Sequence, residues 1–317
     1  MSIKMKNLLT HLQHPNSTKD YQAEDEPDAI KISEYWGRRT YQNQKPKISF
    51  ELFPPKSDSA NKLLKKTHQK LSEINPDYFS VTFGALGLSQ NDTFDTVADL
   101  SENTIIPIIP HLTCVGIDKK QVTDLLDEYI AQGVNQIMVL KGDYPKTIIK
   151  KGDFNYANEM VEFIKENYLD INILVAAYPE KHPHSNCIST DIDFFVNKVN
   201  AGADKAVTQY FYNIDAYLHF IEEVQKRNID IPITPGIMPI TNYDQLIYFS
   251  KTCGAEIPAW ILNKLKLYKN DLNSLKEFGE DVVSEMCLKL KDNGVSSFHF
   301  YCLNKAEPTL SIVKKIT

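Results

Sequence analysis

The sequence lacks most features that mark secreted, membrane-bound and nucleic-acid-binding proteins. Its longest uninterrupted apolar stretch runs only from Ile105 to Pro110, whereas a membrane-spanning helix needs roughly 20 such residues. The first residues, MSIKMKNLLTHLQHP, contain no apolar core of a signal peptide. The chain carries 35 Lys and Arg against 41 Asp and Glu, so it has no basic excess for nucleic acid. We therefore expect a cytoplasmic protein that binds neither membranes nor nucleic acids.

Cysteine is also scarce, and no two cysteines have the spacing of a known motif. The five cysteines lie far apart and form no CxxC pair, so neither a disulfide framework nor a zinc motif is indicated. His182 and His184 follow Glu180 closely, but their spacing matches no standard set of metal ligands. We expect reduced thiols and no metal site.

The composition itself is that of a globular protein, with 42% hydrophobic residues among 317. Residues 1–45 differ from the rest because they are polar and show little apolar periodicity. We expect residues 1–45 to be an N-terminal extension and residues 46–317 to be a single catalytic domain.

Short apolar runs alternate with amphipathic helical stretches from residue 47 onward. Runs that are apolar on both faces are typical of buried parallel strands, and they cover residues 48–53, 78–83, 105–113, 136–142, 173–178, 206–212, 231–237 and 297–303. Helices are expected over residues 60–74, 120–132, 156–168, 191–201, 214–227 and 243–252, with two or three more between 257 and 291.

Eight strands that alternate with helices predict an α/β protein, a single (β/α)8 TIM barrel. A doubly wound parallel sheet is the competing fold. It is less favoured because no GxGxxG or GxxxxGK[ST] motif follows the first strand.

In a (β/α)8 barrel, catalytic groups stand where the strands end. Glu51 lies inside an apolar strand, and its desolvation would suit it to donate a proton near neutral pH. A salt-bridged structural role for Glu51 is the alternative. Asp143 could equally serve a turn, and His111 could be a structural barrel histidine.

The strand ends carry nine motifs that occur in order and at the spacing of one known family. The motifs are FELFPPK (50–56), SVTFGA (80–85), PHLTC (110–114), LKGDYP (140–145), VAAYPEKHP (175–183), AGADKAVTQYFY (201–212), PGIMPI (235–240), IPAW (257–260) and FHFYCLNKAE (298–307). Together they resemble methylenetetrahydrofolate reductases of the bacterial type, over about residues 47–316.

The resemblance implies a flavoprotein oxidoreductase with FAD as its cofactor. Such an enzyme takes a hydride from NADH or NADPH and passes it to 5,10-methylenetetrahydrofolate, in a ping-pong scheme that yields 5-methyltetrahydrofolate for methionine synthesis. The flavin supplies the redox chemistry, and the protein supplies orientation and a proton. Family members are commonly dimers or tetramers, so a homo-oligomer is expected.

The same resemblance assigns roles to individual residues. Glu51 corresponds to the general acid that helps to open the folate ring, and Asp143 to a catalytic carboxylate near flavin and pterin. Gln209, Phe249 and Lys305 correspond to further substrate contacts, with Lys305 replacing the usual Arg. The cofactor-binding positions implied for FAD are Thr82, His111, Leu140, Lys141, Gly142, Asp143, Ala176, Tyr178, His182, Asp191 and Lys198.

Two other functions stay open on the sequence. A folate-dependent methyltransferase without flavin would need no FAD contacts, and a non-catalytic barrel would not need Glu51, Asp143 and Gln209 together. The presence of both sets of residues favours the flavin-dependent reductase.

Overall fold

The computed structural model describes residues 45–83, 90–142, 152–183 and 185–317. All of them belong to one compact unit, Thr40–Thr317; a second unit, Met1–Arg39, lies entirely outside the described residues. The expected N-terminal extension over residues 1–45 therefore falls outside them as well, except for its last residue.

Parallel strands alternate with helices along the described chain. The strands are β1 (Lys47–Leu52), β2 (Tyr78–Val81), β3 (Ile108–Thr113), β4 (Gln136–Leu140), β5 (Asn172–Ala177), β6 (Lys205–Thr208), β7 (Ile233–Thr234), β8 (Gly236–Ile237) and β9 (Ser297–Tyr301). The helices are α2 (Asp58–Ser72), α3 (Gln90–Ser101), α4 (Lys119–Ala131), α5 (Ala157–Asn167), α6 (Ile188–Asn200), α7 (Ile214–Gln225), α8 (Tyr243–Cys253), α9 (Ala259–Leu267), α10 (Leu272–Asp292) and α11 (Thr309–Ile316).

The strands form a closed barrel, because the two end strands of the sheet are joined by a single proline. In the sheet order β7-β6-β5-β4-β3-β2-β1-β9-β8, the two end strands are separated in sequence by Pro235 alone. A single strand was expected over residues 231–237, but Pro235 has no N–H to donate and interrupts the ladder. Its carbonyl still accepts from the His299 N–H at 3.0 Å. The expected (β/α)8 barrel is confirmed, with its seventh strand in two pieces.

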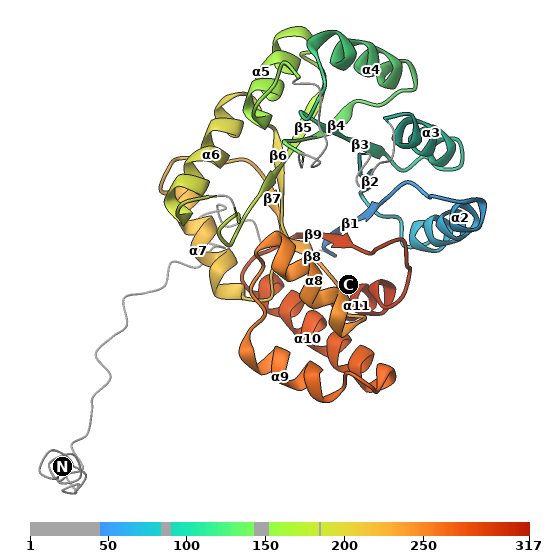
Figure 1. Cartoon of the computed structure of the whole chain (residues 1–317), viewed down its shortest axis with the longest axis vertical. Helices are drawn as coiled ribbons and strands as arrows, with labels where there is room; N and C mark the ends of the chain where they lie inside the picture. Colours follow the sequence, from blue (N-terminus) through green and yellow to red (C-terminus); the bar gives the residue numbers. More distant parts are fainter. Residues whose placement is uncertain (1–44, 84–89, 143–151, 184) are drawn as a thin grey trace, which may run out of the picture. The chain divides into compact units, whose positions relative to one another are not determined.

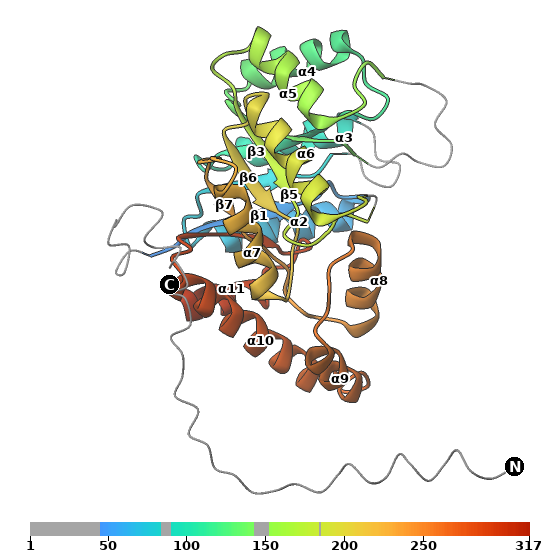
Figure 2. The same ribbon diagram turned by 90° about the vertical axis from the view of Figure 1, so that its left-hand side faces the viewer.

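The helices surround this ring of strands. Helices α2 to α7 follow one another around it in chain order (Figure 1), and α9 and α10 lie on the side away from α4 and α5 (Figures 1 and 2). Two helices, α9 and α10, occupy the stretch between residues 257 and 291, as expected. A helix was expected after each strand, but α3 was not given a range, because its sequence QNDTFDTVADLS has few apolar residues at helical spacing.

Helix ends follow the sequence closely. Asp118 caps α4, with its side chain accepting from the Gln121 N–H and the Gln121 side chain accepting in return, as in a capping box. Gly133, Gly202 and Gly294 follow α4, α6 and α10 with φ of 84°, 114° and 91°, the left-handed region that glycine adopts without strain. The expected cap and the three glycine stops are confirmed.

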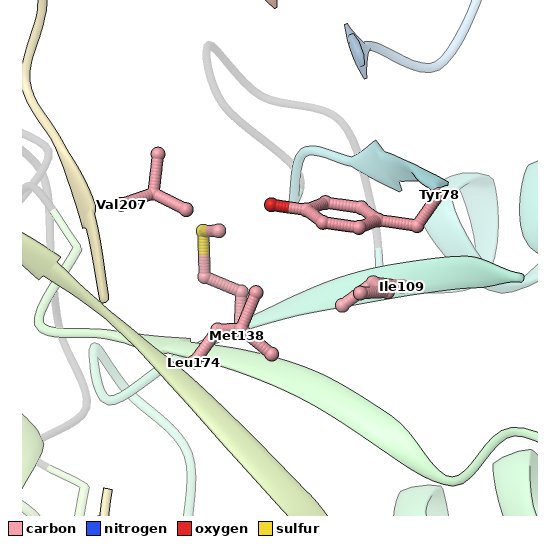
Figure 3. Close-up of a cluster of buried hydrophobic side chains, with 5 residues drawn as sticks. All are labelled: Tyr78, Ile109, Met138, Leu174 and Val207. Carbon is pink, nitrogen blue, oxygen red and sulfur yellow. The ribbon is translucent and has the colours of Figure 1, made fainter. Parts of the chain in front are cut away.

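The strands bury apolar side chains on both faces. Inside the barrel, Tyr78, Ile109, Met138, Leu174 and Val207 from β2 to β6 form a cluster, in which the Tyr78 hydroxyl is directed across the barrel (Figure 3). On the other face, Phe50 is fully buried, with ring centroids 5.8 Å from Phe79 and 6.1 Å from Phe300. Burying one such ring stabilises the fold by about 1.5–3 kcal/mol.

Candidate active site

Glu51 lies on β1 two residues after Ser49, so both share one face of the strand, opposite to Phe50. The Glu51 side chain is 23% exposed, and desolvation raises the pKa of its carboxyl to about 8. A carboxyl group with this pKa is mostly protonated at neutral pH and can serve as an acid there.

His111 of β3 faces Glu51. Its Nε2 lies 3.8 Å from Glu51 Oε2, and its side chain is only 3% exposed. Burial lowers the pKa of His111 to about 3, so the imidazole is neutral beside a neutral carboxyl and the two form no ion pair near pH 7. Within the described part of the chain, the buried His111 Nε2 has no hydrogen-bond partner.

A second buried histidine, His299 of β9, lies nearby; it belongs to the motif FHFYCLNKAE, but no role was predicted for it. His299 Nδ1 is 2.8 Å from the Ser49 hydroxyl, and its ring stacks on Tyr78 at 5.6 Å. Burial, with a smaller contribution from His111, lowers the pKa of His299 to about 3. Ser49 and His299 are 250 residues apart in the sequence, so no local pattern links them. The one available signal was that Ser49 lies on the same face of its strand as Glu51.

Three of the expected cofactor contacts surround the ends of β1 to β4. The Thr82 N–H donates to the Leu52 carbonyl at 2.9 Å, immediately after Glu51. Leu140 ends β4 and packs against the core cluster inside the barrel. Gly142 has φ of 78°, and a Cβ there would lie 2.8 Å from the Thr113 Cβ. Only glycine fits this position without strain.

Two further expected cofactor-binding residues, Lys141 and Asp143, flank Gly142 in the sequence. The Lys141 side chain is exposed, with its Nζ 5.0 Å from the centroid of the Tyr156 ring. Asp143, the second expected catalytic residue, lies outside the described residues.

The remaining expected cofactor residues gather between β5 and α6. The rings of Tyr178 and His182 meet edge to face at 4.7 Å, and Asp191 Oδ2 accepts from the His182 N–H at 2.8 Å. Lys198 Nζ donates to the carbonyl of Ala176 and lies 6.0 Å from the Tyr178 ring centroid. The structure therefore brings all five residues, from Ala176 to Lys198, into one cluster.

The charge of Lys198 shows what this cluster can bind. Desolvation lowers the pKa of its ammonium group to about 8, although Asp191 raises it in part. A half-buried cation of this kind is stabilised by an anion. Lys198 therefore fits an anionic group such as the pyrophosphate of a cofactor.

The three further expected substrate residues do not contact Glu51 directly. Gln209 follows β6, and its side-chain carbonyl accepts from the Tyr210 N–H at 3.0 Å. Phe249 is half-buried on α8 beside Tyr248, and Lys305 is exposed after β9. Among the described residues, no hydrogen bond or ion pair joins these three side chains to Glu51 or His111.

The described ranges hold no group of three or more His, Cys, Asp or Glu side chains arranged for a metal ion. No described helix combines the length and apolar character needed to cross a membrane.

The sequence matches a known protein family. The family model described as methylenetetrahydrofolate reductase matches residues 37–317. A 5,10-methylenetetrahydrofolate reductase of Buchnera aphidicola (subspecies Schizaphis graminum) is 38% identical over 270 residues, which cover 85% of this chain and 91% of that protein. The Escherichia coli protein of the same name is 33% identical, over 84% of this chain and 88% of its own.

More distant similarities extend to plants and to one solved structure. Methylenetetrahydrofolate reductase (NADH) 1 of Arabidopsis thaliana is 30% identical over 85% of this chain but only 48% of its own length. A Clostridium thermocellum protein that binds two copies of 5-methyl-5,6,7,8-tetrahydrofolic acid superposes with a TM-score of 0.62 at 16% identity, over 87% of this chain and 96% of that one. At this identity the superposition supports the fold alone.

Proposed function

The chain belongs to the methylenetetrahydrofolate reductase family, and we propose that it performs the reaction of that family, the reduction of methylenetetrahydrofolate. FAD would be the bound cofactor, and NADH or NADPH would be the hydride donor. The observation that carries the proposal is Glu51, a carboxyl group that is uncharged at neutral pH and faces His111 where β1 and β3 end. A reduction that must also protonate its substrate needs such a group.

The β5–α6 cluster would hold the cofactor. Lys198 supplies the cation for the pyrophosphate, while Asp191 holds the backbone of His182 and thereby the loop that carries Tyr178. His111 is proposed as a further contact from β3. Bound FAD would supply the hydride chemistry between nicotinamide and folate, and the two substrates would use the site in turn. The other proposed contacts are Thr82, Leu140, Lys141, Gly142, Asp143 and Ala176.

Glu51 would supply the proton for the folate. The five-membered ring of 5,10-methylenetetrahydrofolate opens only when one of its nitrogens leaves, and a neutral nitrogen is a better leaving group once it is protonated. Desolvation keeps the Glu51 carboxyl in its acid form, so its Oε atoms can deliver that proton at neutral pH. After ring opening, the carboxylate is regenerated as the acid by solvent.

The remaining residues would orient the substrate. Gln209 offers an amide that can both donate to and accept from a pterin, Phe249 offers an aromatic face on α8, and Lys305 offers a cation for the glutamate tail. Asp143 is proposed as the carboxylate near flavin and pterin. The product, 5-methyltetrahydrofolate, would serve methionine synthesis in the cytoplasm.

Anaerobic reduction of the FAD-loaded protein tests the proposed function. The flavin absorbance should bleach on addition of NADH or NADPH, and it should return when 5,10-methylenetetrahydrofolate is added. Comparison of the two nucleotides also identifies the preferred donor. A protein that binds no FAD after reconstitution, or whose reduced flavin is not reoxidised by the folate, would overturn the proposal.

A further inference from the structure

Asn304, in the turn after β9, binds the backbone of β1 just beyond Glu51. Its Oδ1 accepts from the Phe53 N–H at 3.0 Å, and its Nδ2 donates to the Phe53 carbonyl at 2.8 Å. The Asn304 side chain is buried. One amide group thus satisfies both polar groups of a single residue, as a neighbouring strand would.

The two residues before Phe53 are held as well. The Cys302 thiol donates to the Glu51 carbonyl at 3.1 Å, and the Thr82 N–H donates to the Leu52 carbonyl at 2.9 Å. The backbone that carries Glu51 is therefore tied to β9 on one side and to β2 on the other.

The turn that presents Asn304 has an unusual conformation. Leu303 and Asn304 have φ of 52° and 54°, so two consecutive residues other than glycine occupy the left-handed region. The Thr67 hydroxyl on α2 donates to the Asn304 carbonyl at 3.1 Å and holds the turn from outside. Strained backbone of this kind persists where its surroundings over-determine it, and it clusters at functional sites.

We propose that Asn304 is a positioning residue, whose amide holds the end of β1 so that the Glu51 carboxyl stays beside His111, mostly shielded from solvent. This inference rests on the proposed function, in which Glu51 is the acid. Without the amide, the last residues of β1 lose two hydrogen bonds, and the carboxyl can turn outward and become hydrated.

The pKa of Glu51 reports whether its carboxyl is shielded or hydrated, because the described groups that face it carry no charge. These groups are His111 from β3, Tyr78 from β2, Tyr301 at the end of β9, and Cys302 immediately after it. Burial lowers the pKa of His111 and raises the pKa values of Tyr78, Tyr301 and Cys302, so all four are uncharged near pH 7. With respect to the described residues, the pKa of Glu51 therefore reports hydration and not a neighbouring charge.

The test is a carbon-13 NMR titration of the full-length protein with labelled glutamate, in which the Glu51 resonance is assigned by its loss in Glu51→Gln. Asn304→Gly removes the amide but keeps a residue that adopts the same φ. Leu303→Gly is the matched control, since it places glycine at the neighbouring strained position and leaves the amide in place. We expect Asn304→Gly to lower the pKa of Glu51 by at least about one unit, and Leu303→Gly to leave it within about 0.3.

The two half-reactions give a second readout. A misplaced acid should slow reoxidation of reduced flavin by methylenetetrahydrofolate by about 10²-fold in Asn304→Gly, while reduction of the flavin by nicotinamide changes little. Thr67→Val, which removes only the outer contact of the turn, should shift the Glu51 titration in the same direction by a smaller amount.

An unchanged Glu51 titration in Asn304→Gly, or an equal shift in Leu303→Gly, would overturn the positioning role. Failure of the proposed function shows differently: Glu51→Gln would then leave folate reduction intact, whatever the titration shows.

Discussion

The Glu51 carboxyl and the His111 imidazole lie 3.8 Å apart and are both uncharged near neutral pH. A carboxylate and an imidazolium at this distance in water would attract one another. Here burial disfavours the charged form of both groups, because it raises the pKa of the acid and lowers that of the base. The pair is thus a proton donor beside a neutral ring.

The pH dependence of folate reduction should follow from this pair. Because the pKa of Glu51 is raised to about 8, the acid form is present below that pH and is lost above it. The rate of flavin reoxidation by methylenetetrahydrofolate should therefore fall about tenfold per pH unit above about pH 8. Stopped-flow traces from about pH 6 to 10 measure it. Glu51→Gln is the control, and a pH limb of the same shape in that variant would assign the limb to another group.

The raised pKa of Glu51 also predicts that this residue costs stability at high pH. The folded-state pKa of about 8 lies above the ordinary glutamate value of 4.5, so the folded protein binds the proton more tightly than the unfolded chain. The stability linked to that proton is fully present below pH 4.5 and is lost as the pH rises to about 8. Glu51→Gln should thus raise the Tm at pH 8 by a few degrees, with a smaller gain at pH 5. An equal change at both pH values would contradict this linkage.

Lys198 should dominate the affinity for FAD. Loss of a charge-assisted hydrogen bond costs about 1.5–3 kcal/mol, so Lys198→Met should weaken FAD binding about 10- to 100-fold in a flavin fluorescence titration. Lys205→Met is the matched control, because Lys205 is also half-buried but lies at the start of β6, where it donates to Gln136 at 3.3 Å. Similar losses in both variants would mean that Lys198 acts only through stability.

Gly142 should tolerate substitution less than Gly133. Both have positive φ, but a Cβ at Gly142 would lie 2.8 Å from Thr113, whereas a Cβ at Gly133 meets nothing within 4 Å. Gly133→Ala should lower the free energy of unfolding by about 1 kcal/mol, and Gly142→Ala by about 2–3 kcal/mol. Chemical denaturation measures both. Equal losses would show that the end of β3 can yield to the added methyl group.

The sequence predicted the barrel because its strands are buried on both faces, which leaves long apolar runs such as IIPIIPHLT. It predicted one strand over residues 231–237, where the structure has β7 and β8, since a periodicity argument does not register the missing N–H of Pro235. It predicted a helix after each strand but no range for α3, whose side-chain pattern is too polar to stand out.

Within the candidate site, the resemblance to a family identified Glu51, His111 and the β5–α6 residues, and the structure brings the members of each group together. Ser49, His299 and Asn304 were missed for a different reason. Their partners are about 250 residues away in sequence, and a serine, a histidine or an asparagine has no distinctive local signal. Such contacts become visible only when the first and last strands of the barrel meet.

The central claim is that Glu51 delivers the proton that opens the folate ring, and Glu51→Gln tests it most directly. The amide keeps the size and hydrogen-bonding atoms of the carboxyl but cannot give up a proton. Stopped-flow measurement should find reduction of the flavin by nicotinamide nearly unchanged, and its reoxidation by methylenetetrahydrofolate slower by about 10²–10⁴-fold. Equal loss in both half-reactions, or full activity with folate, would contradict the account.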